Sequence, residues 1–165
     1  MMEVISQKNE VTEGNSSIFC KRVVAGLNRL AEVNQERNKE YLLAFEETKD
    51  IVLKPVFQRY SMQSMEFINI LSDCIKEHRG EYMHVLPKAQ NIQKSWKGFK
   101  FIFSMPSPED ILSSCENCEA IAISTYKKIL SLHHFPHETY VEISRQKDQI
   151  EKAFNQMISL SDHVN

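Results

Sequence analysis

Apolar residues recur at steps of three and four along most of this chain, a spacing that places them on one face of an α-helix. Four stretches show the pattern, and they cover residues 17–49, 52–78, 108–133 and 137–160. In the first stretch the repeating positions are Phe19, Val23, Leu27, Leu30, Tyr41, Phe45 and Thr48. The pattern therefore predicts an all-α fold of four long amphipathic helices, each burying one stripe.

Residues that break helices are scarce. The 165-residue sequence holds 4 glycines and 5 prolines, which favours long helices over a turn-rich β fold. Residues 1–16 lack the periodic pattern and are predicted to form a flexible N-terminal tail. Residues 17–165 suffice for one core and are predicted to form a single domain. Gly80 is the expected stop of the second helix, and Ser107 is the expected cap of the third.

A long connection, residues 79–108, separates the second and third helices, whereas the other two links are short. In a helical bundle such a connection runs along the bundle and joins parallel helices. Within it, the sequence NIQKSWKGFKFIF predicts a short extra amphipathic helix, with one side formed by Ile92, Trp96, Phe99 and Phe103. Two helix pairs joined by a crossover predict a ferritin-like four-helix bundle.

Charge and hydropathy exclude several classes of function. The formal net charge is −2 with both signs interspersed, so no basic surface is expected and nucleic acid is not a predicted partner. No apolar run approaches the roughly 20 residues that span a bilayer. The polar, acidic N-terminus lacks the apolar segment of a signal peptide, so a cytoplasmic location is expected. The cysteines are then expected to be reduced core thiols; they are Cys20, Cys74, Cys115 and Cys118.

Four segments carry a resemblance to a known family. They are LNRLAEVNQERNKEYLLAFEETKD, FQRYSMQSMEF, IQKSWKGFKFIF and CENCEAIAISTYKKIL. Their order and spacing, over nearly all of residues 27–160, resemble a bacterial ferritin-like family of unknown function, DUF2383. The resemblance implies the four-helix-bundle fold and no established activity. The chain departs from the family at residues 36–39, where many members have glycine and acidic residues, and at Phe154, where many have a histidine.

A ferritin-like bundle raises the hypothesis of a di-iron or di-manganese site. Such a site takes a glutamate from each of two helices and a Glu-x-x-His from each of the other two. None of the four predicted helices contains Glu-x-x-His, so no metal or other cofactor is expected. Iron or manganese enters only under the alternative that a degenerate site binds metal. The candidate ligands would then be Glu66, Glu116, Glu119 and Glu151.

Polar residues interrupt the apolar stripes at mid-helix, which predicts a polar layer in the bundle core. Glu119 lies between Cys115 and Ala122 on the stripe of the third helix. It is therefore expected to be buried and to have a polar neighbour from another helix. Lys147 of the fourth helix is the expected partner. The predicted layer consists of Asn34, Asn38, Gln63, Ser64, Glu119 and Lys147.

Two short motifs have both a chemical and a plainer interpretation. Cys115 and Cys118 form a Cys-x-x-Cys, which does redox work when its first thiolate lies at a helix N-terminus. Cys115 is expected two turns inside the third helix, so the pair is interpreted as two core residues. His133, His134 and His137 could together bind a divalent metal. Because they cluster in a turn, they are expected to be solvated.

The predicted crossover helix combines aromatic and basic residues, and it could contact a membrane surface or a partner. The plainer interpretation is that it packs over the bundle and closes the core. Its residues are Trp96, Phe99, Phe101 and Phe103, with Lys97 and Lys100.

The expected function is a non-catalytic structural or protein-interaction module, with a stress-related role as one interpretation. The expected partner is a second copy of the chain or an unidentified protein. The alternative is a divalent-metal-binding protein of the di-iron carboxylate type, with a degenerate site around Glu119.

Overall fold

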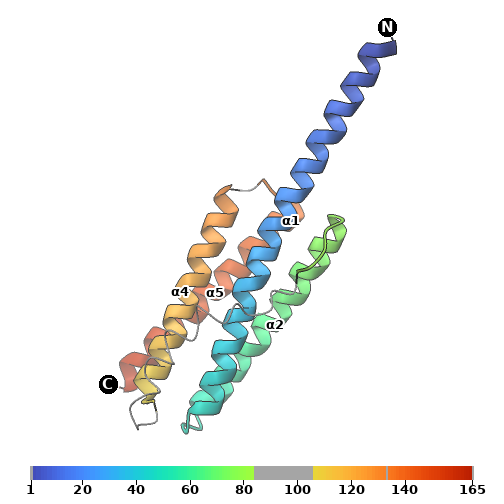
Figure 1. The fold of residues 1–165 in the computed structure, drawn as a ribbon. Coiled ribbons are helices and arrows are strands. Elements are labelled where there is room, and N and C mark those ends of the chain that lie inside the picture. The colour runs from blue at the N-terminus through green and yellow to red at the C-terminus, as the bar shows by residue number, and fades with distance from the viewer. Residues whose placement is uncertain (1, 84–105, 133, 165) are drawn as a thin grey trace.

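The computed structural model describes residues 2–83, 106–132 and 134–164, and its helices lie side by side along one axis (Figure 1). They are α1 (Met2–Glu47), α2 (Leu53–Glu77), α4 (Pro108–Leu132) and α5 (His137–Val164). No strand occurs in these ranges, so the predicted all-α four-helix bundle is confirmed. Nor does any helix in them have the length and apolar character to cross a membrane. The short helix predicted within the crossover falls outside the described residues.

The relative directions of the helices follow from the pairs of residues that contact each other across them. Asn34 and Arg37 of α1 bond to Tyr126 and Glu119 of α4, respectively, so these helices run antiparallel. Helices α2 and α5 are also antiparallel, because Gln63 contacts Gln149 and His78 contacts Thr139. A short link makes α1 and α2 antiparallel as well (Figure 1). Hence α2 and α4 run parallel, as the length of the connection between them predicted.

The first helix is longer than the sequence pattern indicated. It begins at Met2, whereas the sequence pattern predicted a helix start at residue 17. The flexibility expected of residues 1–16 stays a prediction. Once a helix has nucleated, each further residue adds a hydrogen bond at little cost, and this segment holds one glycine, Gly14, and no proline. Figure 1 shows this end of α1 extending beyond the other helices. The remaining helix boundaries agree with the predictions within a few residues.

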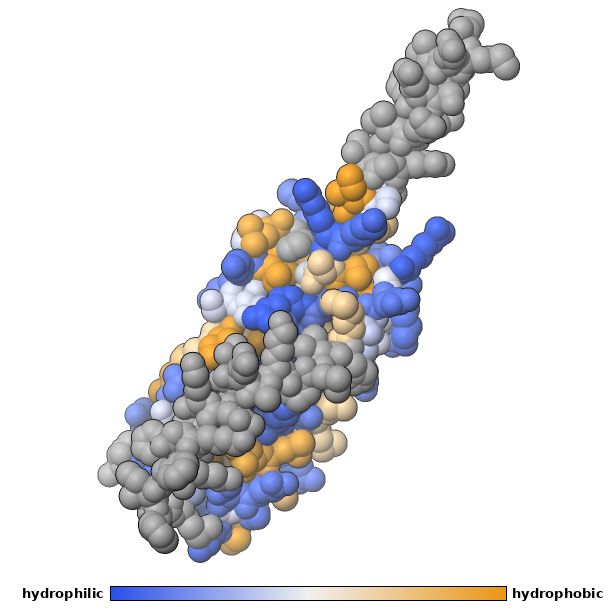
Figure 2. Space-filling model, viewed as in Figure 1, coloured by the Kyte–Doolittle hydropathy of each residue, from blue (hydrophilic) through white to orange (hydrophobic). Residues whose placement is uncertain are grey.

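The core consists of two apolar clusters with a polar layer between them. One cluster includes Leu27, Leu71 and Tyr126, all fully buried, and lies toward the end from which α1 extends. The other includes Tyr41 and Phe57 and lies toward the α1–α2 link. The outer surface of the bundle mixes hydrophilic and hydrophobic residues (Figure 2). Burial of the two clusters therefore supplies the hydrophobic driving force, and the layer between them carries the polar chemistry.

The ends of the middle helices are closed by local hydrogen bonds. Ser107 caps α4 as predicted, because its Oγ accepts the backbone N–H of Asp110 at 3.2 Å. At the end of α2, Arg79 adopts a left-handed conformation with φ 57°, and the N–H of Gly80 donates to the Ile75 carbonyl at 2.9 Å. Gly80 was the predicted stop, and side-chain atoms of Val24 pack directly against it. A Cβ there would lie 2.5 Å from Cγ2 of Val24.

Candidate functional site

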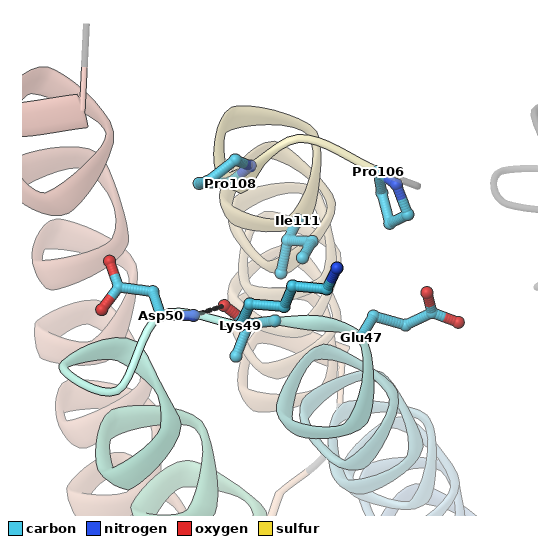
Figure 3. Close-up of a pocket in the computed structure, with 7 residues that line it drawn as sticks. Glu47, Lys49, Asp50, Pro106, Pro108 and Ile111 are labelled. Atoms are coloured by element: carbon cyan, nitrogen blue, oxygen red, sulfur yellow. Dashed lines mark hydrogen bonds between the residues drawn. The ribbon is translucent and has the colours of Figure 1, made fainter. Parts of the chain in front are cut away.

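A pocket lies at the end of the bundle where the α1–α2 link meets the start of α4 (Figure 3). Its volume is about 150 Å³, below the roughly 300 Å³ at which small-molecule sites begin. One of its polar side chains is already engaged, since Thr48 Oγ1 accepts the backbone N–H of Asp50 at 3.2 Å. The pocket is therefore a packing gap at a helix junction, and the chemistry of the bundle lies at its centre. It is lined by Glu47, Thr48, Lys49, Asp50, Pro106, Pro108 and Ile111.

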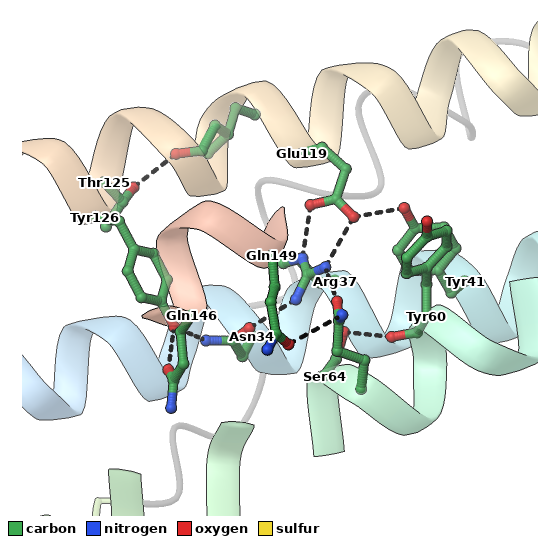
Figure 4. Close-up of polar contacts among 12 residues, drawn as sticks. Asn34, Arg37, Tyr41, Tyr60, Ser64, Glu119, Thr125, Tyr126, Gln146 and Gln149 are labelled. Carbon is green, nitrogen blue, oxygen red and sulfur yellow. Dashed lines mark hydrogen bonds and ion pairs between the residues drawn. The ribbon is translucent and has the colours of Figure 1, made fainter. Parts of the chain in front are cut away.

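The centre of the bundle holds a buried ion pair between α1 and α4 (Figure 4). Nε of Arg37 donates to Oε2 of Glu119 at 2.7 Å, and Nη2 donates to Oε1 at 2.8 Å. Both side chains are 0% exposed. Two parallel hydrogen bonds match the planar guanidinium to the carboxylate, the strongest arrangement available to these groups. The charges therefore neutralise each other where water cannot reach them.

The remaining polar atoms of the pair also have partners. Nη1 of Arg37 donates to Oδ1 of Asn34 at 2.9 Å, and Nη2 also donates to Oε1 of Gln63 at 3.1 Å. The hydroxyl of Tyr41 donates to the carboxylate at 2.5 Å. The guanidinium carbon lies 5.8 Å from the centre of the Phe67 ring, within range of a cation–π attraction. Each nitrogen of the guanidinium and each oxygen of the carboxylate thus has a partner within the chain, as a buried charge requires.

A chain of hydrogen bonds leads from this pair to the surface of α5. Nδ2 of Asn34 donates to the Tyr126 hydroxyl at 2.6 Å, and that hydroxyl donates to Oε1 of Gln146 at 2.7 Å. Nε2 of Gln146 then donates to Glu142 at 2.9 Å, and Glu142 is also bound by Arg145. Every donor points away from Arg37 and toward Glu142. Such a series of aligned bonds is mutually polarising, which strengthens each of them.

The protonation states of the network follow from burial and charge. Burial lowers the pKa of Arg37, but Glu119 beside it has the larger combined effect and raises that pKa above its ordinary value. Burial, followed by the charge of Glu119, raises the pKa of Tyr41 well above its ordinary value. Burial and then Glu40 do the same for the pKa of the Cys115 thiol. Near neutral pH the site therefore contains a fixed cation, a neutral phenol and an unreactive thiol.

The predicted polar layer is present in part. Asn34, Gln63 and Glu119 belong to the network, and the expectation that Glu119 is buried with a polar partner from another helix is confirmed. Ser64 is buried beside it, and its hydroxyl donates to the Tyr60 carbonyl at 2.8 Å. Asn38 is only half-buried and instead accepts a hydrogen bond from Ser61 at 2.7 Å.

The predicted pairing of Glu119 with Lys147 was wrong. Lys147 lies at the edge of α5, where its Nζ bonds Asp148 at 2.8 Å and Glu151 at 3.2 Å. Its side chain is 19% exposed, whereas the Glu119 side chain is fully buried. The physical reason is that a lysine head group stays in water when it can, whereas Arg37 supplies five donors in a plane that suits a buried carboxylate.

Most contacts of the polar layer are made by residues that the sequence pattern did not assign to it. They were missed because the interruption of the first stripe was assigned to Asn34 and Asn38, four residues apart. Counting on from Asn34 by three and then four would have reached Arg37 and Tyr41, which share its face. The missed members of the network are Arg37, Tyr41, Tyr126, Gln146 and Gln149.

Two of the other candidate metal ligands have partners of their own, and the third is exposed. Glu116 accepts from the Ser161 hydroxyl at 2.5 Å, Glu66 is exposed, and Glu151 pairs with Lys127 at 3.1 Å. Among the residues that the structure describes, no three His, Cys, Asp or Glu side chains are grouped to hold an ion. A single Glu-x-x-His does occur in the sequence, at residues 81–84, but it follows the end of α2 and its histidine lies outside the described residues.

The remaining motifs fall at helix interiors and ends. Cys115 is buried inside α4 and Cys118 is half-buried one turn later, where burial and then Glu119 raise its pKa. His134 and His137 are exposed at the α4–α5 turn, and His133 lies outside the described residues. The aromatic and basic segment around Trp96 also lies outside them.

The fold and its centre define an all-α four-helix bundle with a self-satisfied ion pair in its core. No protein-family model matches the sequence, and a comparison with curated proteins finds no match.

Proposed function

We propose that this chain is a non-catalytic helical-bundle protein of ferritin-like topology that acts in the cytoplasm as a structural or protein-interaction module. The observation that carries the proposal is the position of Arg37. Its guanidinium binds both oxygens of Glu119, a fully buried carboxylate in the bundle centre. A permanent organic cation occupies the place that a metal-binding bundle of this kind would reserve for an ion.

Ligand chemistry supports the same conclusion. A metal ion at the bundle centre needs several carboxylates free to coordinate it, and it adds charge to the site. Here Glu119 already bonds to Arg37 and Tyr41. A divalent cation beside Arg37 would add like-charge repulsion in a region with little screening. The site is arranged to hold the four helices in one register.

The topology supports the ferritin-like assignment within this proposal. Two antiparallel pairs with α2 parallel to α4 are the arrangement that a single long crossover produces in ferritin-like bundles. The resemblance to the bacterial family of unknown function is consistent with it. A stress-related role is part of the proposal through that resemblance alone.

The test is elemental analysis of the full-length protein, purified without a chelator or a histidine tag. We expect iron, manganese and zinc well below one ion per chain. Near-stoichiometric metal that is lost on Glu119→Ala would overturn the proposal in favour of the metal-binding alternative. Arg37→Met is the informative companion variant, since it removes the resident cation and leaves the carboxylate. If Arg37 is what excludes metal, only that variant should gain affinity for Mn²⁺ in a titration.

A further inference from the structure

Polar contacts link each helix to the next around the bundle centre, and these links differ in strength. Arg37 of α1 and Glu119 of α4 share two charge-assisted hydrogen bonds of 2.7 and 2.8 Å. Gln146 of α5 accepts a hydrogen bond from α4 at 2.7 Å, and Arg37 donates to Gln63 of α2 at 3.1 Å. The link that closes the ring joins Gln63 to Gln149 of α5 and is 3.5 Å long. That length lies beyond the usual range for a hydrogen bond, so the ring is weakest between α2 and α5.

Other contacts along the α2–α5 edge are weak as well. Nε2 of His78 lies 3.3 Å from Oγ1 of Thr139. Among the described residues, the ion pairs of α2 and α5 stay within one helix or join α5 to α4. These two helices are also the least closely packed of the four neighbouring pairs. The bundle therefore has a strong edge between α1 and α4 and a weak edge on the opposite side.

One close contact holds the weak edge, and it lies toward the α1–α2 link. Oε1 of Gln156 accepts hydrogen bonds from the Tyr60 hydroxyl and from Nη2 of Arg59, each at 2.5 Å. The guanidinium carbon of Arg59 also lies 4.7 Å from the centre of the Tyr60 ring. Arg59 is exposed, and water can replace the partners of exposed polar groups at little cost. This contact can therefore break while each helix stays intact.

We propose that the bundle opens along the α2–α5 edge, with the α1–α4 contact as the hinge and Gln156 as the latch. The two hairpins, α1 with α2 and α4 with α5, stay intact as the edge separates. This inference rests on the proposed interaction role, because opening exposes apolar side chains of the kind that protein partners bind. Phe57 and Met157, fully buried in the closed bundle, lie within one turn of the latch.

The side on which the bundle opens follows from the cost of breaking each edge. Separating α1 from α4 would leave the buried charges of Arg37 and Glu119 unpaired, and it would break the 2.6 Å bond from Asn34 to Tyr126. Separating α2 from α5 leaves that ion pair in place. Because part of the apolar core is exposed, the open form is a minor population. Partial openings of this kind often follow hairpin boundaries.

Two buried positions on opposite sides of the bundle provide the test. Cys115 is 0% exposed and lies one turn before Glu119, on the face of α4 that meets α1. Ala153 is also 0% exposed and lies one turn from both Gln149 and Gln156, on the face of α5 that meets α2. The full-length Ala153→Cys variant is labelled with a thiol reagent in native buffer, and peptide mapping reads each site separately. Urea denaturation checks that the variant is folded.

We expect the thiol introduced by Ala153→Cys to become accessible more often than Cys115. Relative to its labelling rate in the unfolded chain, it should show an opening constant at least about tenfold larger. Its labelling should also depend less steeply on urea, because opening exposes less surface than global unfolding does. Equal constants with equal urea dependence would mean that both sites open only by global unfolding, which overturns the proposal. A larger constant for Cys115 would place the opening at the α1–α4 edge and overturn it too.

Gln156→Leu tests the latch. The variant removes the acceptor for Tyr60 and Arg59, so it should raise the opening constant at position 153 about tenfold and leave that of Cys115 unchanged. The matched control is Asn155→Leu, because Asn155 is an exposed side-chain amide on the same turn of α5. Equal effects of the two variants would rule out Gln156 as the latch.

Met157 provides a second readout that needs no introduced thiol. It is 0% exposed, and hydrogen peroxide converts it to the sulfoxide only when the side chain is accessible. Gln156→Leu should speed this oxidation about tenfold, whereas Asn155→Leu should not change it. An unchanged rate in Gln156→Leu would count against the proposal even if Ala153→Cys fails to fold. None of these readouts involves a metal, so their failure leaves the elemental analysis unaffected and the two proposals fail separately.

Discussion

The guanidinium of Arg37 and the carboxylate of Glu119 meet through two hydrogen bonds, 2.7 and 2.8 Å long, across the interface between α1 and α4. This pairing joins residues 82 positions apart in the sequence. It lies between the two apolar clusters of the core. Asn34, Gln63 and Tyr41 form hydrogen bonds to it. Its energetics can be tested directly.

Removing one partner of the pair should be much worse than removing both. Arg37→Met or Glu119→Leu alone leaves an unpaired buried charge and should lower the free energy of unfolding by about 3–5 kcal/mol. The double variant removes both charges and should recover most of that loss. Urea denaturation of the four proteins measures the coupling. Lys147→Met is the control and should change stability by less than about 1 kcal/mol, because its pairs are at the surface. Additive losses in the double variant would contradict this account.

The buried phenol of Tyr41 should make the fold sensitive to alkaline pH. Its folded-state pKa is raised, by burial first and then by Glu119. Above the ordinary tyrosine pKa of about 10, the unfolded chain loses this proton while the folded chain keeps it. The stability contribution is therefore complete below about pH 10 and is lost as pH rises through the folded-state pKa.

Tyr41→Phe removes this source of pH dependence. The decline in unfolding free energy between about pH 10 and 11 should be shallower than in the wild type, by up to about 1.4 kcal/mol per pH unit. Denaturant titrations across that range provide the measurement. Tyr140→Phe is the matched control, since Tyr140 is 47% exposed. An unchanged slope in Tyr41→Phe would mean that the phenol titrates alike in both states.

Tyr126→Phe tests the hydrogen-bond chain toward α5. The variant keeps the ring in the core but removes the donor to Gln146 and the acceptor for Asn34. It should cost about 1–3 kcal/mol, because Oε1 of a fully buried glutamine is then left unsatisfied. Amide hydrogen exchange should locate the loosening in α5 near Gln146. A loss equal to that of Tyr140→Phe would show that the chain contributes nothing to stability.

The end of α2 offers a pair of substitutions with opposite signs. Arg79→Gly should stabilise the protein by about 1 kcal/mol, since glycine adopts the left-handed conformation without a Cβ clash. Gly80→Ala should destabilise it, because the new methyl group would lie 2.5 Å from Cγ2 of Val24, so that the Val24 side chain or the backbone at residue 80 must shift. Thermal unfolding of both variants is sufficient. Equal melting temperatures would contradict the described packing at this corner.

Much of the fold was accessible from the sequence because amphipathic periodicity is a local property. The stripes around Leu27 and Leu71 specified helices with one buried face, and the length of the connection before Pro108 specified parallel α2 and α4. The start of α1 was not accessible in this way. A segment without a buried stripe can still be helical when it continues an existing helix, since propagation needs no packing of its own.

The sequence by itself determined that four amphipathic helices form a bundle and that Glu119 faces its core, because burial of a stripe depends only on spacing along one helix. Tertiary structure alone decided that Arg37, and not Lys147, neutralises that carboxylate. The choice depends on how α1 is rotated about its axis relative to α4. It also depends on which side chain can place its donors at the bundle centre with enough hydrogen bonds to offset the cost of desolvation. A difference of one residue in the assumed stripe turns a side chain by about 100°, given 3.6 residues per turn, so the identity of the partner is settled only when the helices pack.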